Sequence, residues 1–75
     1  MLYLIRHAKA GSRVAYKGDD RLRPLNGPGR RQAKALATRL APMLKTTGVT
    51  TLYSSPFIRC IETLQPLAKE IGAVI

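Results

Sequence analysis

Residues 26–48, "NGPGRRQAKALATRLAPMLKTTG", carry the clearest periodic pattern in the chain. The opening "NGPG" is typical of a turn that starts a helix. Apolar side chains then recur at the spacing of one helix face, with Arg and Lys between them: Ala33, Leu36, Ala37, Leu40 and Leu44. The pattern predicts an amphipathic helix that ends near Gly48.

Short apolar segments lie on both sides of this helix. Residues 2–5 form an unalternating apolar run, typical of a strand buried on both faces, and residues 49–54 are β-branched and aromatic. Residues 73–75 resemble the start of a third strand. The resulting β-α-β-α-β order predicts an α/β fold with three α/β/α layers and a mainly parallel sheet. Because its edges are open and its last strand has only begun, we expect a truncated domain.

A second helix is predicted between the last two strands. Ser55 is expected to be its N-cap, with Pro56 at the first helical position. Apolar residues keep the helical period as far as Ile71, but Pro66 removes one backbone hydrogen bond from the interior. We therefore expect a break or kink near Gln65.

The composition restricts the class of function. Among 75 residues, 13 Lys and Arg stand against four Asp and Glu, and the net charge of +9 favours anionic partners such as phosphoesters, nucleic acid or acidic lipid. One cysteine and one histidine form no Cys/His cluster, so we expect no metal, no cofactor and no disulfide. The first apolar run ends at Arg6, far short of the roughly 20 residues of a membrane span. We expect a soluble, cytoplasmic protein with no membrane partner.

The single histidine is the first candidate functional residue. Arg6 and His7 follow the first predicted strand, and Arg59 follows the second, at the sheet edge where open parallel sheets bind ligands. An imidazole nitrogen can attack phosphorus while arginines neutralise charge on the phosphoryl oxygens. A lone histidine more often has a structural or surface role than a catalytic one. Because Arg59 lies at the equivalent end of the second predicted strand, the two interpretations of His7 become about equally well supported.

Three motifs resemble a known family in their order and spacing. "LIRHAKA" (4–10), "RPLNGPGRRQA" (23–33) and "SSPFIRCIETL" (54–64) are similar to the first half of the histidine phosphatase, or phosphoglycerate mutase-like, superfamily. Within it, the chain resembles the SixA-type phosphohistidine phosphatases. The loop "AGSRVAYKGDDRLRPL" (10–25) is also similar to the phosphatase domain of Nudix-fused proteins of the MutT type. The resemblance implies that residues 1–75 are the N-terminal half of a single histidine phosphatase domain.

The resemblance also assigns roles to individual residues. It implies that His7 is the nucleophile that becomes a phosphohistidine, and that Arg6 and Arg59 hold the phosphate. Asp20 matches an acidic residue that assists proton transfer or shapes the pocket, while a solvated turn is the competing interpretation of this position.

Basic residues of the same loop are candidates for substrate binding. Lys9 and Arg23 are the first of these, and a solvated charged loop explains them equally well.

The chain also departs from the family pattern. It has no second histidine, and neither Glu62 nor Glu70 has the context of the family's general acid. The resemblance implies that the intact parent is a hydrolase that acts on a phosphorylated protein or on a small phosphoester or nucleotide. Because the second histidine and the general acid are missing, we expect the 75-residue chain alone to be inactive.

Two other classes of function remain open. The first is a non-catalytic fragment or interaction module that self-associates through its open sheet edge. The second is a basic nucleic-acid-binding module, supported by the Arg-rich residues 13–39 and disfavoured by the shortage of aromatic residues for stacking on bases.

Overall fold

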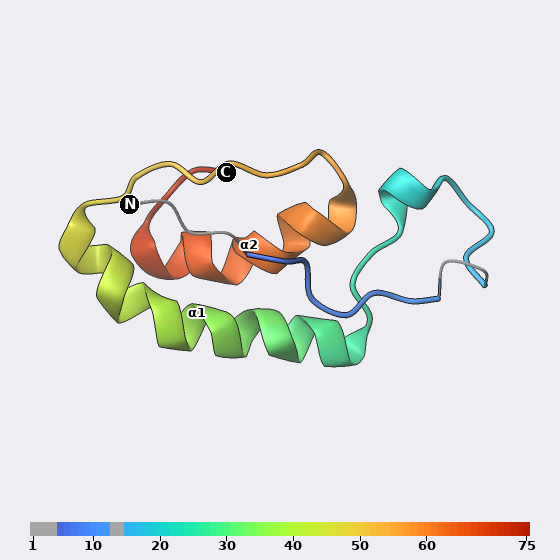
Figure 1. The fold of residues 1–75 in the computed structure, drawn as a ribbon, viewed down its shortest axis with the longest axis horizontal. Helices are drawn as coiled ribbons and strands as arrows, with labels where there is room; N and C mark the ends of the chain where they lie inside the picture. Colours follow the sequence, from blue (N-terminus) through green and yellow to red (C-terminus); the bar gives the residue numbers. More distant parts are fainter. Residues whose placement is uncertain (1–4, 13–14) are drawn as a thin grey trace.

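Two helices packed side by side form the body of the protein (Figure 1). The computed structural model describes residues 5–12 and 15–75. Helix α1 spans Gly27–Thr47, helix α2 spans Ile58–Ile71, and a short 3-10 turn, η1, spans Asp20–Leu22. Extended segments connect these elements and run along the helix pair (Figure 1). Within the described residues, no helix has both the length and the apolar character needed to cross a membrane.

Helix α1 confirms the helix predicted from residues 26–48. The side chain of Asn26 is its N-cap and accepts a hydrogen bond from the Gly29 N–H at 2.8 Å, with Pro28 in the first turn. The helix ends at Gly48, which has a φ of 71°. This left-handed conformation costs glycine little, because glycine has no Cβ.

Helix α2 begins later than predicted and is not broken. Phe57, not Ser55, is its N-cap, since the Ser55 hydroxyl accepts a hydrogen bond from the Phe57 N–H at 3.3 Å and stabilises a bend before the helix. The predicted break near Gln65 is also wrong, because α2 continues through Pro66. Leu64 and Leu67, on either side of this proline, are buried, and tertiary packing of this kind overrides local helix propensity.

The core lies between the two helices and under the extended segments. Its buried cluster consists of Ala37, Ala41, Leu44 and Leu67. The small alanine side chains let the two helix backbones approach closely, and Leu67, which is fully buried, contributes about 2 kcal/mol of hydrophobic stabilisation. Five partly buried residues pack against this cluster: Ile5, Leu40, Val49, Leu52 and Ile71.

The predicted three-layer α/β/α fold is wrong for the described part of the chain, which is helical and contains no sheet. Thr51 and Val74 form one isolated parallel bridge, in which the Leu52 N–H donates to the Val74 carbonyl at 2.7 Å. Because each extended segment meets a neighbour at a single position, the successive hydrogen bonds of a ladder do not form. The strand predicted for residues 2–5 lies outside the described residues, apart from Ile5.

Candidate functional site

Hydrogen bonds from both helices hold the segment that carries His7. This segment crosses α2 and reaches the N-terminal end of α1 (Figure 1). The Ala8 N–H donates to the Thr63 hydroxyl of α2 at 2.9 Å, and the Lys9 N–H donates to the Gln32 side-chain carbonyl of α1 at 2.9 Å. The backbone on the C-terminal side of the histidine is therefore fixed to two separate elements.

Gly29 allows the His7 segment to pack closely against α1. A Cβ atom on the buried Gly29 would lie 1.8 Å from the Lys9 carbonyl oxygen, which no real atom pair tolerates. The same carbonyl accepts a hydrogen bond from the Asn26 N–H at 3.1 Å, and the Asn26 side-chain amide donates to the Ala10 carbonyl at 3.2 Å. Asn26 thus caps α1 and also binds the segment that follows His7.

The imidazole of His7 is exposed and its tautomer follows from one contact. Its Nδ1 lies 2.7 Å from the Ala8 carbonyl oxygen. A carbonyl oxygen can only accept a hydrogen bond, so Nδ1 carries the proton. In the neutral ring this leaves the electron pair on Nε2, which is the state a nucleophile requires.

A cavity of about 150 Å³ lies beside His7. Its polar lining comes from His7, from the segment before α2 and from the first turns of α2, where the residues are Ser54, Ser55, Cys60 and Thr63. Ile5, Tyr53 and Leu64 complete the wall. The hydroxyl protons of Ser54 and Thr63 are donated to backbone carbonyls, whereas the Ser55 hydroxyl accepts from the Phe57 N–H and can donate its proton to a ligand. A small cavity with such a donor suits a small anionic group.

Arg59 lies in α2 but is directed to η1. Its guanidinium donates to the Asp20 backbone carbonyl at 2.8 Å and to the Asp20 carboxylate at 3.2 Å, and it lies 4.5 Å from the centre of the Phe57 ring. Arg59 is only 8% exposed, and its buried Nε has no hydrogen-bond partner among the described residues. Arg59 is not among the described residues that line the cavity beside His7.

Arg59, Asp20 and Arg23 form a group that we call the arginine cluster. The Asp20 carboxylate accepts from the Arg23 Nε at 2.9 Å as well as from Arg59. Arg23 is also buried and donates to the Gly11 carbonyl. Two guanidinium groups share one carboxylate, so the cluster carries a net positive charge.

The structure brings together only some of the residues predicted for the site. Asp20, Arg23 and Arg59 are in contact, whereas His7 contacts the wall of the neighbouring cavity. Arg6 and Lys9 are exposed, and Lys9 contributes its backbone to the fixing of the His7 segment. Asp20 is more than a solvated turn residue, because its carboxylate forms ion pairs with two buried arginines.

Prediction from the sequence missed the contacts of Thr63 and of Gln32 with the His7 segment. A signal for Thr63 was present, because it lies four residues after Arg59 and therefore on the same helix face. No local pattern indicates that Gln32 binds the backbone of Lys9, which lies 23 residues earlier in the chain.

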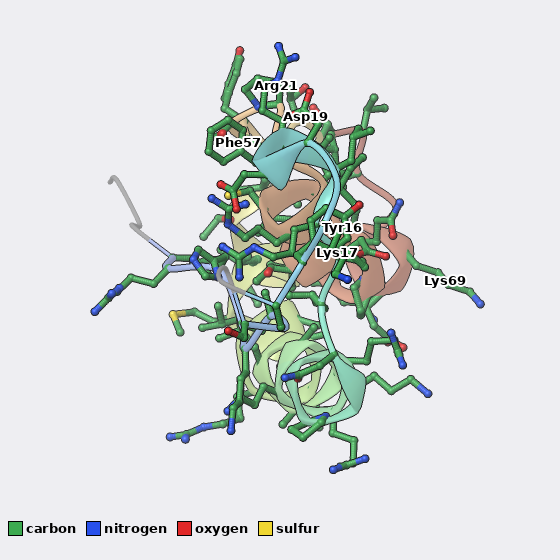
Figure 2. The ribbon with its side chains drawn as sticks, turned by 90° about the vertical axis from the view of Figure 1, so that its right-hand side faces the viewer. Tyr16, Lys17, Asp19, Arg21, Phe57 and Lys69 are labelled. Carbon is green, nitrogen blue, oxygen red and sulfur yellow. The ribbon has the colours of Figure 1, made fainter. Side chains whose placement is uncertain are left out.

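A third ion pair, between Asp19 and Arg21, orders the turn that presents Asp20. Asp19 and Arg21 lie together at η1 (Figure 2), and their side chains approach to 2.6 Å. The hydrogen bonds that Asp19 accepts from the Arg21 side chain, and then from its backbone N–H, lower the pKa of the Asp19 carboxyl below its ordinary value of 3.8. The same contact raises the pKa of the Arg21 guanidinium.

Acidic and thiol side chains do not gather into a metal site in the part of the chain that the structure describes. Among these residues, no three of His, Cys, Asp and Glu lie close enough together to hold a metal ion.

Comparisons with known proteins agree on one family. A family model for the histidine phosphatase superfamily (branch 1) matches residues 2–75. The "8-oxo-(d)GTP phosphatase" of Mycolicibacterium smegmatis (strain ATCC 700084 / mc(2)155) is 47% identical over 72 residues, which cover 96% of this chain and 21% of that protein. A crystal structure from Agrobacterium tumefaciens, assigned as the phosphohistidine phosphatase SixA, has a TM-score of 0.77 and 28% identity. The match covers 95% of this chain and 44% of that one, so the chain spans less than half the length of either relative.

Proposed function

Because the chain belongs to the histidine phosphatase superfamily (branch 1), as its motifs predicted, we propose that it supplies the nucleophile of a phosphatase, His7. One observation carries this proposal: the Nδ1 of His7 donates to the Ala8 carbonyl beside a small polar cavity. This contact leaves the electron pair of a neutral ring on Nε2, where it can attack phosphorus.

The proposed reaction has two steps. In the first, Nε2 of His7 attacks the phosphorus atom, the N–P bond forms, the bond to the leaving oxygen breaks, and that oxygen takes up a proton from solvent. In the second, water attacks the phosphohistidine and releases a proton to solvent, the N–P bond breaks, inorganic phosphate leaves, and Nε2 regains its electron pair.

The arginine cluster supports the binding of an anion in this scheme. Arg59 and Arg23 are buried with a single carboxylate between them, and one buried guanidinium nitrogen of Arg59 lacks a partner among the described residues. We propose that Arg59 and the exposed Arg6 neutralise the phosphoryl oxygens during transfer. Asp20 then shapes the pocket by holding Arg59 in place.

We further propose that the substrate is a nucleotide or another small phosphoester. The relative named 8-oxo-(d)GTP phosphatase supports this class, since it is 47% identical over nearly all of this chain, compared with 28% for the SixA-like structure. The net charge of +9 favours any anionic substrate and does not separate the two classes.

The test uses a full-length protein that contains residues 1–75, because these residues alone are expected to be inactive. It compares the rates of phosphate release from nucleoside phosphates and from a phosphohistidine peptide, for that protein and for its His7→Asn variant. We expect hydrolysis of the nucleotide to be the faster, and the variant to lose at least about a thousandfold of the rate. Lys45→Gln, at the far end of α1, is the matched control and should keep the full rate. An inactive full-length protein, or a His7→Asn variant with unchanged activity, would overturn the proposal.

A further inference from the structure

The two peptide groups of Ala8, the residue that follows His7, each donate an N–H hydrogen bond to a side chain of a helix. The peptide group between His7 and Ala8 uses its N–H to bind the Thr63 hydroxyl. The next peptide group, between Ala8 and Lys9, uses its N–H to bind Gln32 and its carbonyl to accept from the His7 Nδ1. Both contacts therefore act on the backbone that orients the imidazole.

Gln32 acts on the carbonyl that determines the tautomer. A peptide group is planar, and in the trans form its C=O and N–H point in opposite directions. When Gln32 Oε1 fixes the Lys9 N–H from the side of α1, the Ala8 carbonyl in the same plane is directed away from α1. It is this carbonyl that lies 2.7 Å from the His7 Nδ1.

Thr63 fixes the plane of the peptide group between His7 and Ala8, and a contact with α2 determines the direction of its own hydroxyl proton. Its Oγ1 lies 2.6 Å from the Arg59 carbonyl, which can only accept, so the single hydroxyl proton is donated there. The lone pairs of Oγ1 are then left to accept from the Ala8 N–H. Thr63 is only 2% exposed, so water does not replace either bond at low cost.

We propose that Thr63 and Gln32 are positioning residues that together hold His7 in its Nδ1–H tautomer and keep Nε2 available for phosphoryl transfer. The catalytic half of this inference rests on the proposed function, whereas the tautomer is a property of the folded protein alone. Neither residue needs to contact the substrate to have this effect, because each acts through the backbone of Ala8.

The first measurement is the ¹⁵N NMR spectrum of the His7 imidazole in the full chain, at a pH where the ring is neutral. In the unsubstituted protein we expect Nδ1 to carry the proton. Thr63→Val keeps the shape but removes the hydroxyl, and should lower the ratio of Nδ1–H to Nε2–H tautomer about fivefold, the effect of losing one hydrogen bond. Thr63→Ser keeps the hydroxyl and should restore the ratio.

A second variant keeps the test valid if Thr63→Val does not fold. Gln32 is exposed, so Gln32→Met removes the acceptor without disturbing the core, and it should lower the same ratio by a similar factor. Two matched controls should leave the ratio unchanged: Thr38→Val, which loses only a bond to the carbonyl four residues earlier, and Gln65→Met, at an exposed position of α2.

The second measurement asks which ring nitrogen is phosphorylated. After reaction with a phosphate monoester, ³¹P NMR should show phosphorus on Nε2 in the unsubstituted protein and a growing share on Nδ1 in Thr63→Val and Gln32→Met. An unchanged tautomer ratio and an unchanged site of phosphorylation in Gln32→Met would overturn the inference. An unsubstituted protein with the Nδ1–H tautomer but no phosphohistidine would overturn the proposed function and leave the positioning role supported.

Discussion

Gly29 is the residue that allows the His7 segment to lie against α1. Its missing side chain leaves room for the Lys9 carbonyl, and the three backbone bonds of residues 8 and 9 depend on this approach. The position of the His7 segment therefore depends on the absence of a Cβ atom at Gly29, 22 residues after His7 in the chain.

We predict that Gly29→Ala destabilises the protein by about 3 kcal/mol, because the added methyl group would overlap a backbone atom that cannot move away freely. The midpoint of urea denaturation measures this change. Gly11→Ala is the control, since nothing lies within 4 Å of the added atom, and its effect should stay within about 0.5 kcal/mol. Equal effects at the two positions would contradict the close approach at Gly29.

The Asp19–Arg21 pair gives a prediction on pH. The pKa of the Asp19 carboxyl is lowered in the folded protein, mainly by the hydrogen bonds from the Arg21 side chain. A lowered pKa means that the pair stabilises the fold above the unfolded pKa of about 3.9, and that this contribution is lost as the pH falls through the lower folded value. Both groups are exposed, so the contribution is small.

Arg21→Gln should therefore raise the titration midpoint of the Asp19 carboxyl to near 3.8, which NMR of the side-chain carbon measures directly. The difference in stability between the two proteins should be present at neutral pH and should be lost as the pH falls through the lowered pKa of Asp19. A midpoint that does not move would show that the pair does not form in solution.

At the scale of single residues, the sequence predicted which residue types carry the chemistry but not all of their contacts. His7, Arg59 and Asp20 stood out by their motifs, and two of them do meet. The contacts of Thr63 and Gln32 were missed because both join positions far apart in the chain, and only the packed helices bring those positions together.

At the scale of elements, the helix pair owes its stability to the small residues of α1. Ala37 and Ala41 are buried against α2, and their size permits a close contact that larger residues would prevent. Pro42, next to this face, lies inside α1 and is exposed, so it contributes no core contact while lacking an N–H to donate.

We predict that Pro42→Ala stabilises the protein by about 1 kcal/mol. The gain is smaller than the roughly 3 kcal/mol difference in helix propensity, because proline also restricts the unfolded chain. Thermal unfolding should show a higher midpoint. Thr46→Ala, one turn later on an exposed part of α1, is the variant for comparison. A Pro42→Ala variant that unfolds at a lower temperature than the unsubstituted protein would contradict the prediction.

The helices could be predicted from the sequence and the sheet could not. Helical periodicity depends on neighbours three and four residues apart, which the sequence shows directly. Strand pairing depends on distant segments: residues 49–54 have strand-like composition, yet only Thr51 pairs, with Val74. β-Branched residues fit an extended backbone but do not by themselves provide a partner.

At the scale of the whole molecule, charge is the dominant feature. Thirteen basic residues against four acidic ones repel one another, and this repulsion opposes folding at low ionic strength. The acidic residues are few: Asp19 forms its ion pair with Arg21 at η1, and Asp20 forms ion pairs with both arginines of the arginine cluster.

We predict that sodium chloride raises the unfolding temperature by screening this repulsion, and that sodium phosphate at equal ionic strength raises it further by binding. At tenfold excess over its dissociation constant, phosphate would add about 1.4 kcal/mol. Arg59→Gln should remove the difference between the two salts, while Lys45→Gln should keep it. Identical effects of the two salts on the unsubstituted protein would argue against a phosphate site.

We propose that His7 accepts a phosphoryl group on Nε2. To test this, a full-length protein that contains residues 1–75 is trapped during reaction with a nucleoside phosphate, and the label is located by mass spectrometry and ³¹P NMR. We predict an acid-labile phosphoryl group on His7, absent from His7→Asn and present in Lys45→Gln. Phosphate released without any labelled histidine, or a label that persists in His7→Asn, would contradict it.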